Sequence, residues 1–122
     1  MTEPSSQNDL QLELLRQLER RSDSNQRDLA QRLGVSVGKI NYCLRAVIDR
    51  GWVKVKNLRR SDNKLAYAYL LTPSGAFAKM KLARAFLERK EHEFELLQEE
   101  ISALRQELHE AASADGQDIR SQ

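Results

Sequence analysis

The chain has 122 residues, which leaves room for one small domain and an appendage but not for a two-domain enzyme. Hydrophobic residues make up 40% of it and charged residues 31%, and no apolar run approaches the about 20 residues of a membrane-spanning helix, so we expect neither a membrane span nor a secretory signal. The single cysteine, Cys43, excludes an internal disulfide, and one cysteine with two histidines is too few for a structural zinc site, which predicts a cytoplasmic protein without metal or cofactor.

Charge is distributed unevenly along the chain, although the net charge is only +2. Residues 1–35 have a net charge of −1, residues 36–90 carry thirteen basic and three acidic side chains, and residues 91–122 have a net charge of −7. The basic middle segment predicts binding to a polyanion, and the acidic C-terminal segment is expected to stay away from it. The alternative is a solvated surface on which charges cluster by chance.

The first predicted element is an amphipathic helix over residues 9–21. Leucines recur through it at helical spacing, and Asn8 followed by Gln11 resembles a capping box at its start. Residues 1–7 are therefore expected to be a disordered tail.

Two further helices follow with a very short turn between them. Asn25 is placed to cap the first of the two, and Gly34 to end it. Ser36 is placed to cap the next helix, which Gly51 ends. Helices joined by so tight a turn must cross at a steep angle.

The third helix has an apolar stripe formed by Val37, Ile40, Leu44, Val47 and Ile48. The residues that point away from this stripe between positions 36 and 45 include no acidic one, and most of them can hydrogen-bond to base edges or phosphate oxygens. The residues of this outward face are Ser36, Gly38, Lys39, Asn41, Tyr42 and Arg45. Gly38 costs the helix about 1 kcal/mol relative to alanine, so either something approaches this turn closely or the glycine is neutral surface.

Residues 52–59 and 64–71 predict the two strands of a hairpin, with turn-forming residues 60–63 between them. The tip carries Arg59, Arg60 and Lys64. A basic hairpin directly after a helix pair is typical of a winged helix, in which the third helix enters the major groove and the hairpin, the wing, touches the neighbouring backbone. We therefore expect positive charge to gather on this helix and hairpin. The alternative is a solubilising loop.

The run from Asn25 to Ser36, the helix over 37–50, the step Gly51-Trp52-Val53 and the closing Leu71-Thr72-Pro73-Ser74-Gly75 together resemble the winged helix-turn-helix of MarR-type transcription regulators. The stretch from Leu10 to Leu108 is similar to the small MarR-like regulators of exopolysaccharide gene clusters. The resemblance implies sequence-specific binding of double-stranded DNA as a dimer. It also implies that the outward face of the third helix reads the major groove. The wing contacts that it implies are Arg59, Arg60, Asn63 and Lys64.

The sequence departs from the larger MarR proteins at its N-terminus. Those proteins wrap N- and C-terminal helices into a dimerisation domain and often bind a phenolic ligand beside it. Only about eight residues precede the first helix here, so a small-molecule effector is not expected.

The C-terminal segment predicts a long helix over residues 73–112, with Thr72 as its cap. Apolar residues repeat along it at spacings of three and four, with Lys90 as the one polar member of the heptad seam. The seam residues are Met80, Ala83, Leu87, Phe94, Leu97, Ile101, Leu104 and Leu108. A helix of this length on so small a domain cannot bury the seam alone, so a coiled-coil homodimer is the simplest arrangement.

Parallel pairing would bring Glu100 opposite Arg105 of the partner subunit, whereas antiparallel pairing would bring flanking glutamates together. One favourable pair is weak support, and the direction stays open. A helix that docks on another protein is the alternative to a dimer.

The sequence thus predicts a mainly helical α+β protein and no enzyme. Its domains are a tail over 1–7, a winged helix-turn-helix domain over 8–75, a dimerisation helix over 76–110 and a flexible tail over 111–122. The predicted function is a DNA-binding transcription regulator at the nucleoid, with a pseudo-palindromic operator. The competing interpretation is a non-catalytic adaptor that uses the acidic helix, and a third is RNA binding.

Overall fold

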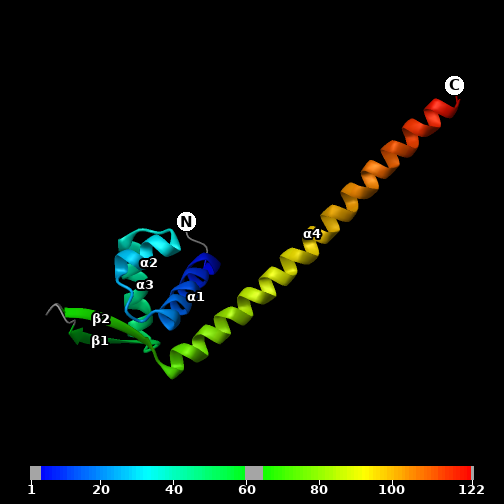
Figure 1. Ribbon diagram of the computed structural model, residues 1–122. Helices are drawn as coiled ribbons and strands as arrows, with labels where there is room; N and C mark the ends of the chain where they lie inside the picture. The colour runs from blue at the N-terminus through cyan, green and yellow to red at the C-terminus, as the bar shows by residue number, and fades with distance from the viewer. Residues whose placement is uncertain (1–3, 60–64, 122) are drawn as a thin grey trace. The chain divides into compact units, whose positions relative to one another are not determined.

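The computed structural model describes residues 4–59 and 65–121 (Figure 1). Its elements, in chain order, are α1 (Pro4–Arg20), α2 (Gln26–Leu33), α3 (Val37–Asp49), β1 (Val53–Arg59), β2 (Leu65–Leu71) and α4 (Pro73–Ser121). The chain divides into two compact units, Met1–Phe86 and Leu87–Gln122. The predicted fold class, mainly helical with a small hairpin and a long C-terminal helix, is confirmed.

Helix α1 begins earlier than the sequence predicts. Its first residue is Pro4, so Asn8 lies inside the helix and the predicted capping box is wrong. Residues 4–7 are helical and not part of a tail. Proline fits the first helical position because it has no N–H to leave unpaired and its φ is already helical.

The caps of the helix pair are as predicted. The Asn25 Oδ1 accepts a hydrogen bond from the Asp28 N–H at 2.7 Å, and Gly34 ends α2 with a left-handed φ of 67°. The Ser36 Oγ accepts from the Lys39 N–H at 3.1 Å at the start of α3. Each hydroxyl or amide oxygen pairs one of the backbone donors that a helix leaves open at its N-terminus.

The two strands pair antiparallel, from Val53 opposite Leu71 to Arg59 opposite Leu65. The Tyr69 N–H donates to the Ser22 carbonyl at 2.8 Å, which ties β2 to the loop after α1. Antiparallel strands joined within a few residues form the hairpin that the sequence predicts.

One hydrophobic core holds the first unit together. It is formed by side chains from all three short helices and both strands, among them Leu14, Leu15, Leu18, Leu29, Ile40, Leu44, Val47, Val53 and Tyr69. Val37 is not part of it, because its side chain is 46% exposed. The predicted stripe of α3 is therefore correct from Ile40 onward and wrong at its first residue.

The start of α4 is fastened to the corner where α3 leads into β1. The Thr72 and Ser74 hydroxyls both donate to the Gly51 carbonyl, at 2.6 and 3.0 Å, and the Gly75 N–H donates to the Thr72 Oγ1 at 3.0 Å. A Cβ on Gly75 would lie 2.0 Å from the Trp52 carbonyl oxygen. Each part of the sequence Thr72-Pro73-Ser74-Gly75 thus has a reason. Thr72 caps the helix, the Ser74 hydroxyl adds a second hydrogen bond to the Gly51 carbonyl, and Gly75 permits a close approach to the Trp52 backbone.

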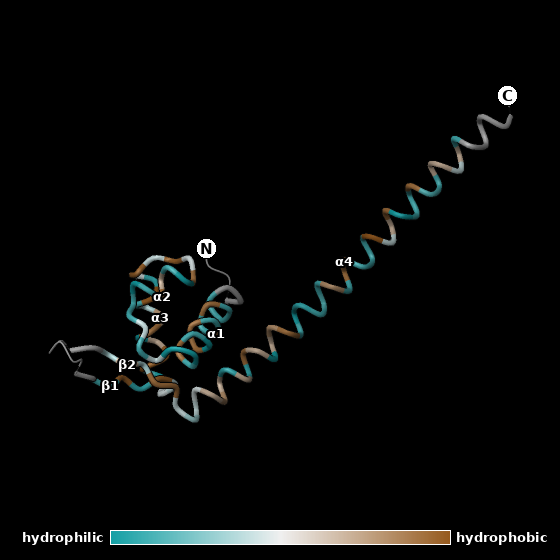
Figure 2. Tube along the Cα trace, in the orientation of Figure 1, coloured by the Kyte–Doolittle hydropathy of each residue, from teal (hydrophilic) through white to brown (hydrophobic). Residues whose placement is uncertain are grey.

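The second unit is the rest of α4. The helix continues through Gly116 to Ser121, so the predicted end near residue 112 and the tail over 111–121 are wrong. Every residue from Lys90 to Asp115 is exposed. Figure 2 shows hydrophobic and hydrophilic residues alternating along this stretch. Among residues 4–59 and 65–121, the structure has no helix with the length and apolarity to cross a membrane.

Candidate nucleic-acid interface

Helix α3 presents two different sides. Ile40, Leu44 and Val47 are buried in the core, whereas the next residues around the helix, Tyr42 and Arg45, are exposed. The Tyr42 side chain is 66% exposed, which is unusual for an aromatic residue in a folded domain. The outward face is therefore free to meet a partner.

The other residues of this face differ in their freedom. Ser36 and Gly38 are exposed, and Lys39 and Asn41 are half-buried. The Ser36 oxygen already accepts from the Lys39 N–H, so its hydroxyl can still donate. A Cβ on Gly38 would meet only the Ser36 Oγ, at 3.9 Å. Nothing within the protein requires a glycine there.

Asn41 has a partner that the sequence does not indicate. Its Nδ2 donates to the Oε1 of Gln26, the first residue of α2, at 3.3 Å. The two side chains lie beside an open cavity of about 320 Å³ between α3 and the hairpin. Arg45 and Tyr67 line the same cavity, and Tyr67 is 56% exposed. Strand alternation could have placed Tyr67 on the face of Tyr69, but only the fold reveals Gln26.

The predicted wing tip falls largely outside the described residues. Arg60, Asn63 and Lys64 belong to the segment 60–64, which lies between the two described ranges. Arg59 is the last residue of β1.

The basic residues do not all gather on one surface, contrary to expectation. The Arg50 Nη1 donates to the Gln11 Oε1 at 3.0 Å and its guanidinium lies 4.9 Å from the centre of the Trp52 ring. Lys79 pairs with Glu19 at 2.6 Å. These two cations stabilise the domain itself. Four more of the basic residues of segment 36–90 lie on α4, namely Lys81, Arg84, Arg89 and Lys90. The prediction therefore applies only to the part of the positive charge that lies on the outward face of α3 and on the hairpin.

The hairpin carries its charge on one side. Val55 faces the cavity next to α3, so Lys54 and Lys56, its neighbours in β1, lie on the opposite face of the two-stranded sheet. Both lysines are exposed. The sheet thus presents an apolar and aromatic face toward α3 and a basic face away from it.

Cys43 is buried, and its thiol has low reactivity. The side chain is 5% exposed, and burial raises the pKa of its thiol, an effect that the Lys39 ammonium only partly opposes. A raised pKa lowers the fraction of reactive thiolate. Within residues 4–59 and 65–121, no three His, Cys, Asp or Glu side chains come together as a metal site would require.

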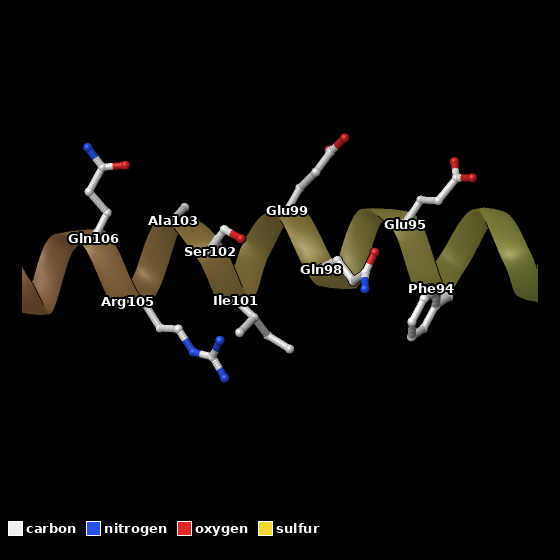
Figure 3. A pocket seen from close by; sticks show the side chains of 9 residues that line it. All are labelled: Phe94, Glu95, Gln98, Glu99, Ile101, Ser102, Ala103, Arg105 and Gln106. Atoms are coloured by element: carbon white, nitrogen blue, oxygen red, sulfur yellow. The ribbon is translucent and has the colours of Figure 1, made fainter.

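The heptad seam of α4 is uncovered in the single chain. Leu87, Phe94, Leu97, Leu104 and Leu108 are each more than half exposed, and Ile101 is 39% exposed. Figure 3 shows Phe94, Ile101 and Arg105 on one side of the helix and Glu95, Glu99 and Gln106 on the other. Lys90 pairs with Glu93 of its own helix at 3.1 Å.

The sequence of residues 7–54 matches the family model described as winged helix-turn-helix DNA-binding. A comparison with curated proteins finds no match.

Several solved structures share the fold. A candidate transcriptional regulator of Thermoplasma acidophilum is 18% identical, with a TM-score of 0.62 over 75% of this chain and 92% of its own. A MarR-family transcription regulator is 21% identical, with a TM-score of 0.54 over 70% of this chain, which spans 54% of that protein. MarR of Staphylococcus aureus, solved with salicylate and kanamycin, is 16% identical, with a TM-score of 0.51 over 79% of this chain and 67% of its own. The helix pair and hairpin of this protein have the winged helix-turn-helix fold.

Proposed function

We propose that the protein is a MarR-type transcription regulator that binds a specific operator as a homodimer. The observation that carries this proposal is the outward face of α3 from Ser36 to Arg45, which exposes Tyr42 and Arg45 beside the half-buried Asn41. The acidic Asp49 lies one turn further on, at the end of the helix. An α-helix fits the major groove of B-DNA, where Arg reads guanine and Asn reads adenine.

The division of labour follows from the chemistry of each part. Asn41 and Arg45 choose the sequence, because their side chains form paired hydrogen bonds with base edges. Ser36 and Lys39 flank the helix start and contact phosphates. Arg60 and the other predicted wing residues contact the backbone beside the groove and release counterions, which adds affinity for any sequence.

The homodimer forms through the seam of α4. Apolar side chains at heptad spacing that are more than half exposed in one chain are buried by a second copy of the same helix. Two-fold symmetry then presents two α3 helices to one face of the duplex, about one or more helical turns apart. The operator is accordingly pseudo-palindromic. Exopolysaccharide gene clusters are the first place to seek it.

A salt titration tests DNA binding. The purified protein is titrated against duplex DNA at several salt concentrations, and the logarithm of the affinity is expected to fall linearly with the logarithm of salt. Absence of duplex binding at low salt would support the adaptor instead. Stronger competition by RNA than by DNA would support RNA binding.

Three arginine or asparagine truncations test the roles. Asn41→Ala and Arg45→Ala are expected to relax sequence preference, and Arg60→Ala to weaken binding to all duplexes alike. Arg120→Ala, in the acidic segment, is the matched control and should change neither. A wing variant that altered base preference would contradict this assignment.

A further inference from the structure

One polar contact connects the two helices of the helix-turn-helix on the side next to the outward face. Gln26 is the first residue of α2, and its Oε1 accepts a hydrogen bond from the Asn41 Nδ2 of α3 at 3.3 Å. Both residues are half-buried beside the cavity that Arg45 also lines. The contact joins residues fifteen apart in the sequence, so it depends on how the helices cross.

The contact with Gln26 occupies one hydrogen-bonding group of the Asn41 side chain, so it determines which groups remain for another partner. A side-chain amide has two N–H donors and one carbonyl acceptor. Gln26 engages one N–H and thereby restrains the rotation of the Asn41 side chain. A second N–H and the Oδ1 remain for another partner.

An N–H beside a carbonyl is the complement of adenine in the major groove. Adenine presents N7 as acceptor next to the N6 amino donor, whereas guanine presents two acceptors, N7 and O6. An amide that paired with guanine in the same way would bring its Oδ1 against guanine O6, with no proton between them. A side-chain amide therefore discriminates between the two purines.

We propose that Gln26 is a positioning residue that holds Asn41 in the orientation that reads adenine. The inference rests on the proposed function, because it requires α3 to enter the major groove. Gln26 lowers the entropy cost of binding, since the Asn41 side chain is restrained before DNA arrives. Gln26 itself need not touch a base.

The test uses a library of duplex oligonucleotides with a randomised central segment. Sequences bound by the full-length protein are recovered and counted, and the same is done for Asn41→Ala, Gln26→Met, Gln26→Glu and the double variant. Met has nearly the length of Gln but lacks the acceptor, whereas Glu keeps an acceptor for the Asn41 N–H.

The wild-type protein is expected to enrich an A·T pair for which Asn41→Ala loses about tenfold in preference. Gln26→Met should lower the same preference about threefold and leave the other positions unchanged. Gln26→Glu should retain it while its negative charge lowers affinity for every duplex. Replacing that adenine by 7-deazaadenine, which lacks N7, should cost the wild type more than it costs Gln26→Met.

The double variant separates positioning from general damage. In the Asn41→Ala background, Gln26→Met should have no further effect on base preference, because the residue through which it acts is gone. An additional loss there or a change at other base pairs would overturn the inference while the proposed function stands. An Asn41→Ala profile that equals wild type would overturn both the inference and the role proposed for Asn41. If the wild type enriches no sequence at all, the proposed function itself has failed.

Discussion

The two units of this protein differ in how much of their stability one chain can provide. In the first unit, eight large side chains are less than 2% exposed, whereas every residue from Lys90 to Asp115 in the second unit is exposed. The heptad pattern of the second unit is nevertheless regular. The first unit thus completes its own core, while the second has a heptad pattern that a second copy would bury in the proposed dimer.

The sharpest test of the self-sufficient unit is a truncation in its core. Leu15→Ala removes a side chain that is fully buried, and we expect it to lower the free energy of unfolding by about 3–4 kcal/mol. Urea unfolding followed by the fluorescence of Trp52 measures this loss. The loss should not depend on protein concentration, and a cost below about 1 kcal/mol would contradict the described core.

The start of α4, which belongs to the first unit, should be almost as sensitive. Gly75→Ala places a Cβ 2.0 Å from the Trp52 carbonyl oxygen and 2.8 Å from the Leu71 Cδ1. Because backbone must shift to make room, we expect a loss of about 3 kcal/mol in the same urea experiment. A variant as stable as the wild type would mean that α4 does not approach Trp52 this closely.

The second unit should respond to truncation only through association. Leu104→Ala shortens a seam side chain that is 57% exposed, and we expect the dimer to weaken by about 2 kcal/mol, as measured by sedimentation equilibrium. The matched control is Leu96→Ala, which changes the same residue type off the seam, where Leu96 is 49% exposed. Equal effects of the two variants would refute the seam.

The smallest effect is expected at Gly38, where protein stability and DNA binding place different demands on α3. Gly38→Ala meets open space, so it should stabilise the protein by about 0.5–1 kcal/mol, in contrast to Gly75→Ala. If DNA approaches this turn, the same variant should bind duplex DNA more weakly while unfolding at higher urea. Unchanged DNA affinity would make Gly38 a neutral surface glycine.

Local signals in the sequence predict much of this fold. A capping residue depends only on its neighbours within three or four positions. The caps Asn25, Gly34 and Ser36 each lie where the sequence predicts them. The ends of the outer helices were predicted less well. Pro4 starts α1 ahead of the Asn8 signal, and a glycine at position 116 does not interrupt α4, because a single glycine costs a long helix only about 1 kcal/mol.

The residues of the candidate interface also divide into those that local sequence signals predict and those that only the fold reveals. The outward face of α3 follows from helical period, so Tyr42 and Arg45 can be assigned to it from sequence. Gln26 cannot, because its contact with Asn41 depends on the crossing of two helices. Arg50 is basic but packs on Trp52, which a count of charges does not reveal.

The Gly51 carbonyl has a mechanical consequence. The Gly51 carbonyl accepts hydrogen bonds from both the Thr72 and the Ser74 hydroxyl. These two bonds connect the corner that follows α3 to the start of α4. In the proposed dimer, a twist of α4 would therefore reach α3 through these two hydrogen bonds, because the Gly51 corner is bonded directly to the start of α4.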